Sequence, residues 1–572
     1  MGAFFLFHKE SKIIEQAVED IYLRKGFKKP VDFHLGEYKL KLYKKQIVNV
    51  NNYFQKNGDY IFVIGSLFYK DLSYKQSLEI LLTDFVDHRL DPNSLFGNYV
   101  ILFFLKNSNL IHFCIDPSFI KNVYFNSNEK IISTDFLSIT ESLLDKFTLN
   151  HLALIENITT GYLISPDTYA NEIQKLDKKN ISSLGKIFPD IKMYQLKPDL
   201  DHQMRNCNQA IDHANQKLAD YFKSVKNLTN EFGAHIGLTG GFDSRLLLMH
   251  ARKHLTKLIT NSFWRPNSIE YLNAKELAKI ADLDFITFEN TPFIKFMEEE
   301  SIEKSYLFFD GQIRSQNNWN EEFNLSDYSF RIAANHFVGF HGCGGEQYRN
   351  ADRMMRKITL RTYIKYEWMF RQCQDVFIDK NLQHVVFKNI ENKIKRLIDI
   401  PNNKVGLPEL KKIQNEIWNS ANRATRVNVV NQQLFYFAPF TEYQLSQAAY
   451  WYIPCLGNAF SFQIEMMKRI DQELLNVNTN YGFNLLRGKP IKFKLVPYLF
   501  NYIPRQLFYY VYFLLKDVQK NKFNINEFQS NSHPVLLKYA REININKLGQ
   551  NVHLGKNLKS FDYLLKNVQF KF

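Results

Sequence analysis

The amino-acid sequence predicts an α/β plus β architecture, in which a layered antiparallel-sheet domain precedes a doubly wound parallel-sheet domain with added helices. Short β-favouring runs separated by turn formers dominate the first 195 residues. Strand and helix candidates alternate from residue 234 onward, which is typical of a parallel sheet with right-handed crossovers. Hydrophobic residues make up 45% of the 572 residues, enough for a core in each domain.

The expected domain boundaries follow the changes of pattern along the chain. An N-terminal domain is expected over 1–195 and a second domain over 200–490. Residues 491–572 are expected to form a basic, aromatic-rich helical extension, because Lys, Asn and aromatic residues dominate there. A chain of this length has room for two to four domains.

The N-terminal domain is predicted to be a sheet because its apolar runs are short and are bounded by turn residues. The runs lie at 61–64, 99–104 and 110–115. Turn formers such as Asn57-Gly58-Asp59 and Asp116-Pro117 separate or follow them. We therefore expect an antiparallel, layered sheet.

The second domain is predicted to begin with a helix over 200–225, where Ile211, Ala214 and Leu218 recur at helical spacing. Residues 350–480 have a mostly helical pattern. Between these helical regions, strands and helices alternate, with strands at 234–238, 258–263 and 283–287 and helices at 244–253 and 268–281.

Several protein classes are excluded by what the sequence lacks. No run of about 18 uncharged apolar residues occurs, so no membrane-spanning helix is expected. The first ten residues lack the basic start and the long apolar core of a secretory signal. Five cysteines lie far apart without a CxxC pair, which argues against a zinc knuckle or a disulfide framework. We therefore expect a cytoplasmic protein.

The most informative segment joins a predicted strand to a predicted helix. Leu238 ends the strand, Thr239-Gly240-Gly241 form the turn, and the helix is expected to begin at Asp243 or Ser244. Glycines allow a tight turn and a close approach of the backbone to an anion. Free amides and the helix N-terminus favour phosphate oxygens, and Thr239 and Ser244 add hydroxyl groups.

Asp243 needs a cation beside it if phosphate binds at this turn, because two negative charges repel each other. We therefore expect Asp243 to be a Mg²⁺ ligand. The alternative is an ordinary strand–helix turn with an Asp or Ser at the N-cap. That alternative explains Asp243 but not the two glycines together with Thr239 and Ser244.

The run from Thr239 to Ser244 resembles the SGGxDS loop of ATP-pyrophosphatases, a group that includes the asparagine synthetases. This resemblance implies a HUP-like parallel sheet, binding of ATP and Mg²⁺, adenylation of a substrate oxygen and release of pyrophosphate. The run from Gly342 to Gln347 is similar to the GxGxDE loop of the asparagine synthetases. That similarity implies nucleotide contacts at Gly344 and Gly345 and a second metal ligand at Glu346, while Gln347 stands where the family has Glu.

Three further segments are similar to those of the asparagine synthetases. They are the helix at 270–281, the run at 438–442 and the region around Arg487-Gly488-Lys489. The last region matches the place where the family has a lysine that contacts the phosphates. The resemblance implies that Lys489 or Lys492 is the catalytic lysine, with Lys489 narrowly preferred. A cation there would meet the charge that builds on the leaving pyrophosphate.

The resemblance extends to the N-terminal domain and covers most of residues 1–500. The run from Leu95 to Tyr99 is similar to the LxGxF segment of glutamine amidotransferase domains, which have an Ntn-type layered fold. Members that hydrolyse glutamine carry a nucleophilic Cys at position 2, whereas this chain has Gly2 and no cysteine before Cys114. A thiolate beside a free α-amino base cannot be built there, so the domain is expected to be degenerate.

The resemblance implies an asparagine synthase-like carbon–nitrogen ligase, which would join a carboxylate to an amine or to ammonia. β-Lactam synthetases and lasso-peptide cyclases also lack the nucleophile and use an amine already present on the substrate. One alternative is a catalytically impaired nucleotide-binding or scaffold protein in a polysaccharide or peptide biosynthetic complex, which Gln347 and Gly2 favour. A second alternative is an RNA-modifying ATP-pyrophosphatase.

The net charge of +15 is concentrated near the C-terminal end. Residues 481–572 hold 15 Lys or Arg and four Asp or Glu, so they carry +11 of the +15. We expect a basic helical tail packed on the second domain. The alternatives are contact with an acidic membrane surface and binding of an acidic substrate, leader peptide or RNA. RNA is disfavoured because RNA-modifying relatives lack an amidotransferase-like N-terminus.

The purified protein is expected not to release glutamate from glutamine, because Gly2 provides no nucleophile. Glutamate formation can be followed with a coupled dehydrogenase assay, with a glutamine-hydrolysing amidotransferase as the positive control. Glutamate release at an enzymatic rate would contradict this prediction.

Overall fold

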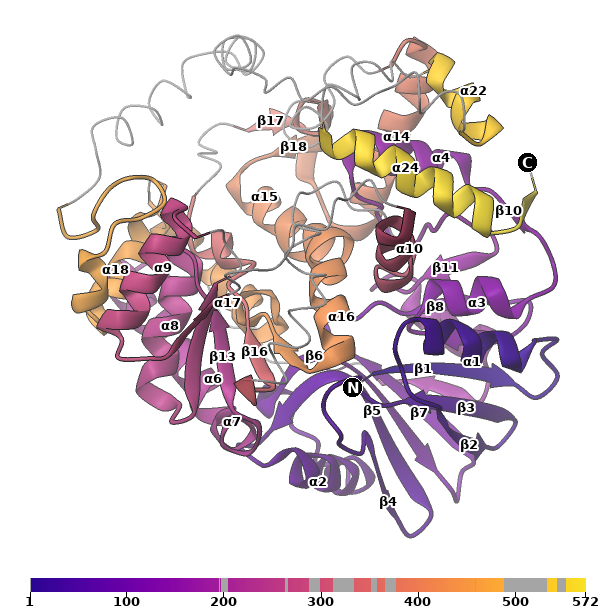
Figure 1. Ribbon diagram of the computed structural model, residues 1–572, viewed down its shortest axis with the longest axis horizontal. Helices are drawn as coiled ribbons and strands as arrows, with labels where there is room; N and C mark the ends of the chain where they lie inside the picture. Colours follow the sequence, from indigo (N-terminus) through magenta and orange to yellow (C-terminus); the bar gives the residue numbers. More distant parts are fainter. Residues whose placement is uncertain are drawn as a thin grey trace.

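Figure 1 shows the computed structural model of the chain, a mixed α/β structure with both antiparallel and parallel sheets. This architecture confirms the coarse fold class expected from the sequence. The structure describes residues 2–194, 196, 204–262, 266–287, 299–311, 334–350, 357–365, 377–457, 459–487, 532–542 and 552–571.

Two sheets form the N-terminal part, and nearly all of their strand pairs are antiparallel. The first sheet has the order β11-β8-β9-β1-β3-β2. The second has the order β12-β7-β6-β5-β4, in which β12 runs parallel to β7. The strands are β1 (Ala3–His8), β2 (Val31–Leu35), β3 (Tyr38–Tyr43), β4 (Tyr53–Lys56), β5 (Asp59–Tyr69), β6 (Leu95–Leu105), β7 (Leu110–Ile115), β8 (Tyr124–Asn126), β9 (Ile131–Ser133), β11 (Ile173–Lys175) and β12 (Ile191–Met193). The three runs predicted as strands lie within β5, β6 and β7.

Strand β1 lies between two hydrophobic cores, and its side chains point alternately into one core and the other. Phe4 faces the second sheet, where its ring centroid lies 6.4 Å from that of Phe113. Phe5 faces the opposite way, into the core beneath α1. This period of two is the pattern of a strand that is buried on both faces. The helices on the outer faces are α1 (Glu15–Arg24), α2 (Tyr74–Val86) and α3 (Phe136–Ser142). The expectation of a layered antiparallel part is thus confirmed.

A five-stranded parallel sheet forms the centre of the second part, with the order β15-β14-β13-β16-β19. Its first strand lies in the middle, so the chain builds one side and then reverses to build the other. That reversal places a switch point between β13 and β16, where ligands of such sheets bind. The elements are β13 (Ala234–Gly237), β14 (Leu258–Ser262), β15 (Phe285–Thr287), β16 (Val338–Phe340) and β19 (Phe435–Phe437), with α6 (Cys207–Ser224), α8 (Phe242–His254) and α9 (Ile269–Ile280) around them in Figure 1.

The predicted strands and helices of this part are confirmed within one or two residues at most ends. One difference matters for the site, because α8 begins at Phe242 and its N-cap is Gly241. Asp243 therefore lies inside the first turn of α8 and is not the N-cap. The helix expected over 200–225 is α6, which begins after Asn206 caps it.

A mainly helical region completes the second part, as expected for 350–480. Three of its helices form one continuous segment, in which a π-helix joins two α-helices. The helices are α10 (Glu299–Phe308), α13 (Leu360–Tyr363), α14 (Lys380–Leu397), α15 (Leu407–Ile413), the π-helix η5 (Gln414–Arg423), α16 (Ala424–Gln433), α17 (Tyr443–Trp451) and α18 (Ser461–Ile470). None of the helices in the described ranges is long and apolar enough to cross a membrane.

The described end of the chain packs on both parts of the molecule. Helix α24 (Val552–Asn567) contacts α10 and α4 (His151–Thr160), and it lies across them in Figure 1. Strand β20 (Phe570–Lys571) then pairs in parallel with β10 (Phe147–Thr148) of the N-terminal part. Burial of Leu558, Phe561 and Leu564 explains the position, because the apolar face of α24 covers a core that both parts of the molecule share. Contact with α10, which lies within the predicted second domain, agrees with the expected packing, while the contacts with α4 and β10 show that this end of the chain also packs on the N-terminal part.

One disulfide corrects the interpretation of the cysteines. Cys207 at the start of α6 is bonded to Cys455 in η7 (Ile453–Cys455), with the two Cα atoms 5.1 Å apart. The two residues are separated by 248 positions, so no local spacing could reveal the pair. Cys114 is a buried free thiol. The absence of a CxxC motif was therefore not informative about this bond.

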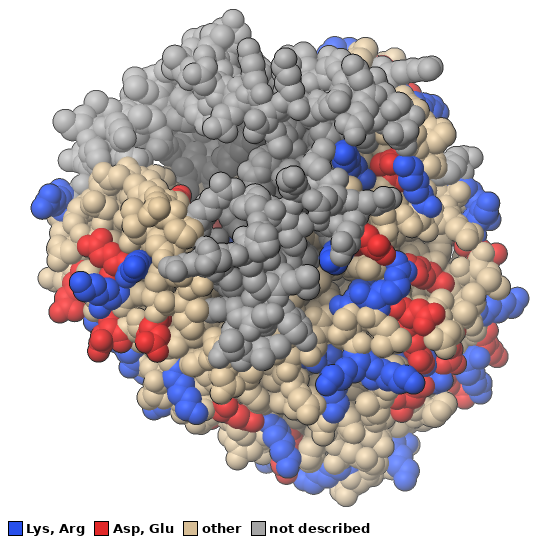
Figure 2. Space-filling view, in the orientation of Figure 1, with Lys and Arg blue, Asp and Glu red and all other residues tan. Residues whose placement is uncertain are grey.

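Surface charge is mixed on the described part of the molecule. On the face in Figure 2, Lys and Arg side chains lie beside Asp and Glu side chains without a large patch of one sign among the coloured atoms. This distribution agrees with a body that is nearly balanced in charge, since most of the excess belongs to residues 481–572. Residues 488–531, which contain Lys489 and Lys492, lie outside the described residues.

Glu442 joins the two parts of the molecule inside their shared core. Its side chain accepts a hydrogen bond of 2.6 Å from the Tyr221 hydroxyl and one of 2.8 Å from the Gly97 amide. Glu442 is only 1% exposed. Burial raises the pKa of Glu442 to about 8, a rise that nearby Asp116 supports and the two hydrogen bonds oppose.

The variant Glu442→Gln is expected to lose part of the pH dependence of stability. Between the usual pKa of about 4.5 and the folded-state pKa of about 8, the folded chain binds more protons than the unfolded chain. Stability from this group therefore falls as pH rises through that window. The variant should have a higher free energy of unfolding than the parent at about pH 9, by roughly 1–3 kcal/mol, and a smaller gain at about pH 6.

Urea unfolding at both pH values measures this effect. The control variant is Glu473→Gln, because the Glu473 side chain is 74% exposed. An unchanged pH dependence in Glu442→Gln would contradict the assignment of a raised pKa.

Candidate functional site

The first predicted loop forms a closed turn at the carboxyl end of β13. The Thr239 amide donates to Ser244 Oγ at 3.2 Å, and the Gly241 amide donates to Thr239 Oγ1 at 3.1 Å. Ser244 Oγ in turn donates to the Thr239 carbonyl at 3.3 Å. Both hydroxyl groups thus hold the turn in shape. Leu238 is buried and hydrogen-bonds across to Asn261 through its amide, so its side chain supports the core.

Gly240 is required by the close approach of two asparagine side chains. A Cβ at Gly240 would lie 2.6 Å from Asn273 Nδ2 and would overlap Asn480 Oδ1. Asn273 is 6% exposed, and its Nδ2 has no hydrogen-bond partner among the described residues. A buried amide without a partner beside a glycine turn is typical of a site that contacts a ligand.

Arg245 ties the first loop to the segment that follows α18. Its guanidinium donates to the carbonyls of Val477 at 2.8 Å and Asn478 at 2.9 Å. The Asn480 amide donates back to the Gly240 carbonyl at 3.2 Å. Arg245 has no exposed surface, so it acts as a structural connection within the core. The sequence placed Arg245 on a helix but gave no signal for this role.

The second predicted loop follows β16 and packs directly against the first. A Cβ at Gly342 would lie 2.8 Å from the Ser244 amide nitrogen, and a Cβ at Gly345 would lie 2.8 Å from Asp243 Cβ. Gly344 has φ +93°, a backbone conformation that favours glycine. The structure thus brings together the residues predicted from both motifs, at the switch point of the sheet.

Asp243 is ion-paired with an arginine from the second loop. Arg349 Nη1 donates to Asp243 Oδ1 at 2.8 Å, and Arg349 Nη2 donates to Oδ2 at 3.2 Å. Gln463 Nε2 also donates to Oδ1, at 2.8 Å. Burial raises the pKa of Asp243, Arg349 and Gln463 lower it, and neighbouring Glu346 raises it, with a net rise. Both carboxylate oxygens of Asp243 are therefore engaged.

Glu346 is ion-paired with a second arginine. Arg423, from the end of the π-helix η5, contacts Glu346 Oε1. Burial alone would raise the pKa of Glu346, but Arg423, Arg349 and Lys411 outweigh it and lower the pKa to about 2. Lys411 Nζ also donates to the carbonyls of Glu346 and Arg349, at 2.6 Å and 2.7 Å. The carboxylate of Glu346 is therefore ionised and held between cations.

The expected Mg²⁺ ligands do not fit a metal ion in this arrangement. Asp243 and Glu346 lie close enough for each to influence the other, as the Mg²⁺ prediction requires. Each carboxylate, however, already binds a guanidinium group. Within the described ranges, no group of three or more His, Cys, Asp or Glu side chains could hold a metal ion.

Gln347, the last residue of the second predicted loop, is fully buried. It has no exposed surface, and neither of its amide atoms has a partner among the described residues. Sequence reasoning identified this position, but missed Arg349, Arg423, Lys411 and Gln463. Arg349 carried a local signal, since it follows Glu346 by three residues. The other three reach the site from separate helices, which no motif could reveal.

The site expected in degenerate form at the N-terminus has no room for a side chain. A Cβ at Gly2 would lie 2.7 Å from the Lys44 carbonyl carbon and would overlap the Tyr43 carbonyl oxygen. A cysteine could not occupy this backbone position without a shift of β3. Absence of glutamine hydrolysis stays a prediction, and this geometry agrees with it.

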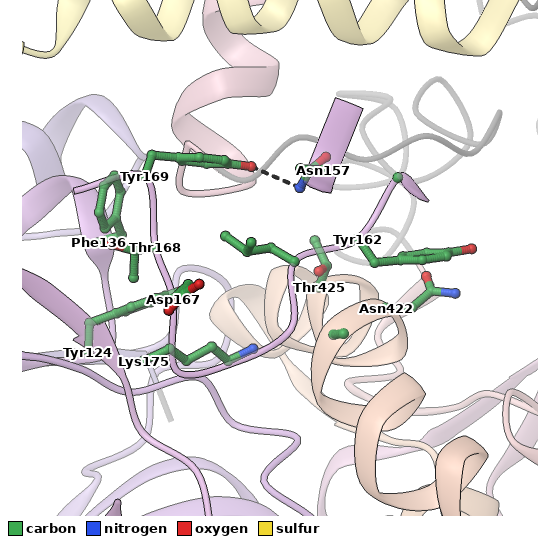
Figure 3. Close-up of a pocket in the computed structure, with 13 residues that line it drawn as sticks. Tyr124, Phe136, Asn157, Tyr162, Asp167, Thr168, Tyr169, Lys175, Asn422 and Thr425 are labelled. Carbon is green, nitrogen blue, oxygen red and sulfur yellow. Dashed lines mark hydrogen bonds between the residues drawn. The ribbon is translucent and has the colours of Figure 1, made fainter. Parts of the chain in front are cut away.

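Two cavities lie away from the loops, between the N-terminal part and the π-helix. Figure 3 shows the smaller, of about 30 Å³, where Asn157 Nδ2 donates to the Tyr169 hydroxyl at 2.9 Å and Tyr162 lies beside Asn422. Its volume suits one or two water molecules. The larger, of about 390 Å³, is lined in part by Phe119, Asn415 and Tyr443. Neither cavity includes a residue of the two glycine loops.

No protein-family model matches the chain, and a search of curated proteins returns no match. The family resemblance therefore rests on the quoted motifs. What the molecule itself adds is the contact between the two loops and the charged groups around them.

Gly345→Ala is expected to lower the free energy of unfolding by roughly 1–3 kcal/mol, because the added Cβ would clash with Asp243 in a packed contact. Urea unfolding measures the change. The control is Gly185→Ala in α5 (Ile181–Ile187), where the nearest atom to an added Cβ is 3.4 Å away. That control should be neutral or stabilising by up to about 1 kcal/mol. Equal stability of Gly345→Ala and the parent would rule out the tight contact.

Proposed function

We propose that this chain binds ATP between the two glycine loops and is an asparagine synthase-like, AMP-forming carbon–nitrogen ligase. The observation that carries the proposal is the contact of two glycine turns at the carboxyl ends of adjacent parallel strands. Such edges are where open α/β sheets bind their ligands. The turns also combine backbone amides, hydroxyl groups and a helix N-terminus, a set that suits phosphate.

The proposed reaction joins a carboxylate to an amine. A carboxylate oxygen of the substrate attacks the α-phosphorus of ATP, and the bond from that phosphorus to the bridging oxygen breaks to release pyrophosphate. The amine, or ammonia, then attacks the acyl carbon, and AMP leaves. The chain's contribution would be to position ATP and to offset the charge that develops on the leaving group.

Individual residues have distinct roles in this proposal. The amides of the first turn and the α8 N-terminus would bind phosphate oxygens, with Thr239 and Ser244 holding the turn in shape. Asp243 would position Arg349 beside the phosphates. Mg²⁺ would supply Lewis-acid chemistry if it binds, although the two carboxylates do not fit it as they stand. Lys489 and Lys492 stay candidates for contact with pyrophosphate, outside the described residues.

A second candidate function is nucleotide binding without turnover, in a biosynthetic complex. The ion pair between Asp243 and Arg349 favours it, because the carboxylate expected to hold a metal is neutralised. Binding of ATP without formation of AMP would distinguish this candidate from the ligase. Contact of the basic residues 491–572 with an acidic partner or membrane surface would be compatible with either.

The ligase proposal is tested by ATP–pyrophosphate exchange over a panel of amino acids, peptides and uronic acids. One carboxylate class should support exchange and AMP formation. Asp243→Ala should reduce that exchange at least about 100-fold, because Arg349 would lose the carboxylate that positions it. The control is Asp284→Ala, an exposed residue just before β15. ATP–pyrophosphate exchange by Asp243→Ala at the rate of the parent would contradict the assignment of this site.

A further inference from the structure

We infer that the phosphate site between the loops is built for a nucleoside triphosphate that carries no divalent metal, with Arg349 and Arg423 supplying the positive charge. The inference rests on the proposed function and deepens it, because it names the form of the nucleotide that the site accepts. A divalent metal at this site would need the carboxylates of Asp243 and Glu346.

Both carboxylates are already bound by guanidinium groups. Asp243 is held at both of its oxygens by Arg349, at 2.8 Å and 3.2 Å, in the bidentate geometry that is strongest for this pair. Glu346 is held by Arg423. A divalent ion would therefore have to displace an arginine from each carboxylate before it could bind there.

The net positive charge around the two loops also favours a triphosphate without a metal ion. Asp243 and Glu346 alone would repel a triphosphate, so a cation would have to lie between these carboxylates and the phosphates. Arg349, Arg423 and Lys411 instead place three positive charges against these two carboxylates. A fourth cation, Arg426, lies beside the loop, with its Nη1 3.2 Å from His341 Nε2. The named groups thus sum to a positive site, which attracts a free triphosphate and repels a metal ion.

Arg349 is held firmly in place. Its carbonyl accepts from Lys411 Nζ at 2.7 Å, its Nη1 lies 3.3 Å from Gln463 Oε1, and its guanidinium lies over the Phe460 ring at 5.6 Å from the centroid. A group fixed in this way needs little reorganisation when an anion arrives. A guanidinium also presents planar N–H donors that match phosphate oxygens.

Arg423 reaches the site because the helix around it is irregular. It ends the ten-residue π-helix η5, and its Nη1 donates to the Gln414 carbonyl at 3.0 Å across the widened turns. π-Helical turns are rare and often mark functional sites. The irregular backbone thus places the Arg423 guanidinium beside Glu346, where it supplies the positive charge that a metal ion would otherwise supply.

The test is isothermal titration calorimetry with ATP, in the presence of either excess EDTA or excess MgCl₂. The parent protein is expected to bind ATP at least about tenfold more tightly in EDTA than in MgCl₂, because the Mg²⁺ complex of ATP carries less negative charge and brings a metal ion to a positive site. Equal or tighter binding in MgCl₂ would overturn the inference. Arg349→Gln is expected to weaken binding at least about tenfold in EDTA and to recover affinity when MgCl₂ is added, because Asp243 is then free to hold the metal. The control is Arg252→Gln, which removes an ion pair with Asp471 at the far end of α8.

A second measurement uses the metal alone. Mn²⁺ should show no saturable binding to the parent in electron paramagnetic resonance titrations, whereas Arg349→Gln should gain a Mn²⁺ site. Loss of that new site in the double variant with Asp243→Asn would assign it to Asp243. Saturable Mn²⁺ binding to the parent that Asp243→Asn removes would overturn the inference.

The same calorimetric titrations distinguish a site that needs Mg²⁺ from a chain that binds no ATP. ATP binding by the parent only in the presence of MgCl₂ would overturn metal independence and leave the nucleotide site standing. Absence of ATP binding under both conditions would overturn the proposed function, and the inference with it. Equal affinity in EDTA for the parent and Arg349→Gln would remove Arg349 from the site.

Discussion

Direct contact between the turn after β13 and the turn after β16 is the constraint on which the rest of the site depends. The turns approach so closely that residues 342 and 345 must lack a side chain. This approach places Asp243 beside Glu346, two carboxylates that repel each other in a partly buried position. Because unpaired buried charges are costly, the surrounding structure has to supply cations, and Arg349, Arg423 and Lys411 do so.

Two of these cations come from one continuous helical segment, which also links the site to the N-terminal part. Lys411 lies on α15 and Arg423 ends η5. Within the same segment the Ser420 carbonyl accepts from Lys175 Nζ at 2.6 Å, and Asn428 Nδ2 donates to the Ile120 carbonyl at 2.7 Å. The N-terminal part therefore supports the helical segment that supplies Lys411 and Arg423 to the site. This structural role needs no nucleophile at Gly2.

Sequence patterns predicted the elements that are determined locally. The strand–turn–helix unit from Ala234 was predicted because its apolar run, glycines and helix starter are contiguous. The observed strand end and helix start differ from the predicted ones by only one or two residues. Where a partner is distant in sequence, prediction failed. Cys207 and Cys455 form a disulfide across 248 residues, and β20 at Phe570 pairs with β10 at Phe147, far away in the sequence. Neither pairing leaves a local pattern, because each depends on how the whole chain folds.

For the candidate site, the sequence by itself determined which backbone turns could approach an anion, because glycine, Thr239 and Ser244 act through their own neighbours. It also predicted a cation beside Asp243 if phosphate binds there, and the family resemblance implied a cation at Glu346. Only the tertiary structure decided what that charge is. Arg349, Arg423 and Lys411 converge there from a loop, a π-helix and an α-helix, and ion pairing depends on separation in space rather than along the chain. In this arrangement the carboxylates expected to hold a metal are both bound by guanidinium groups.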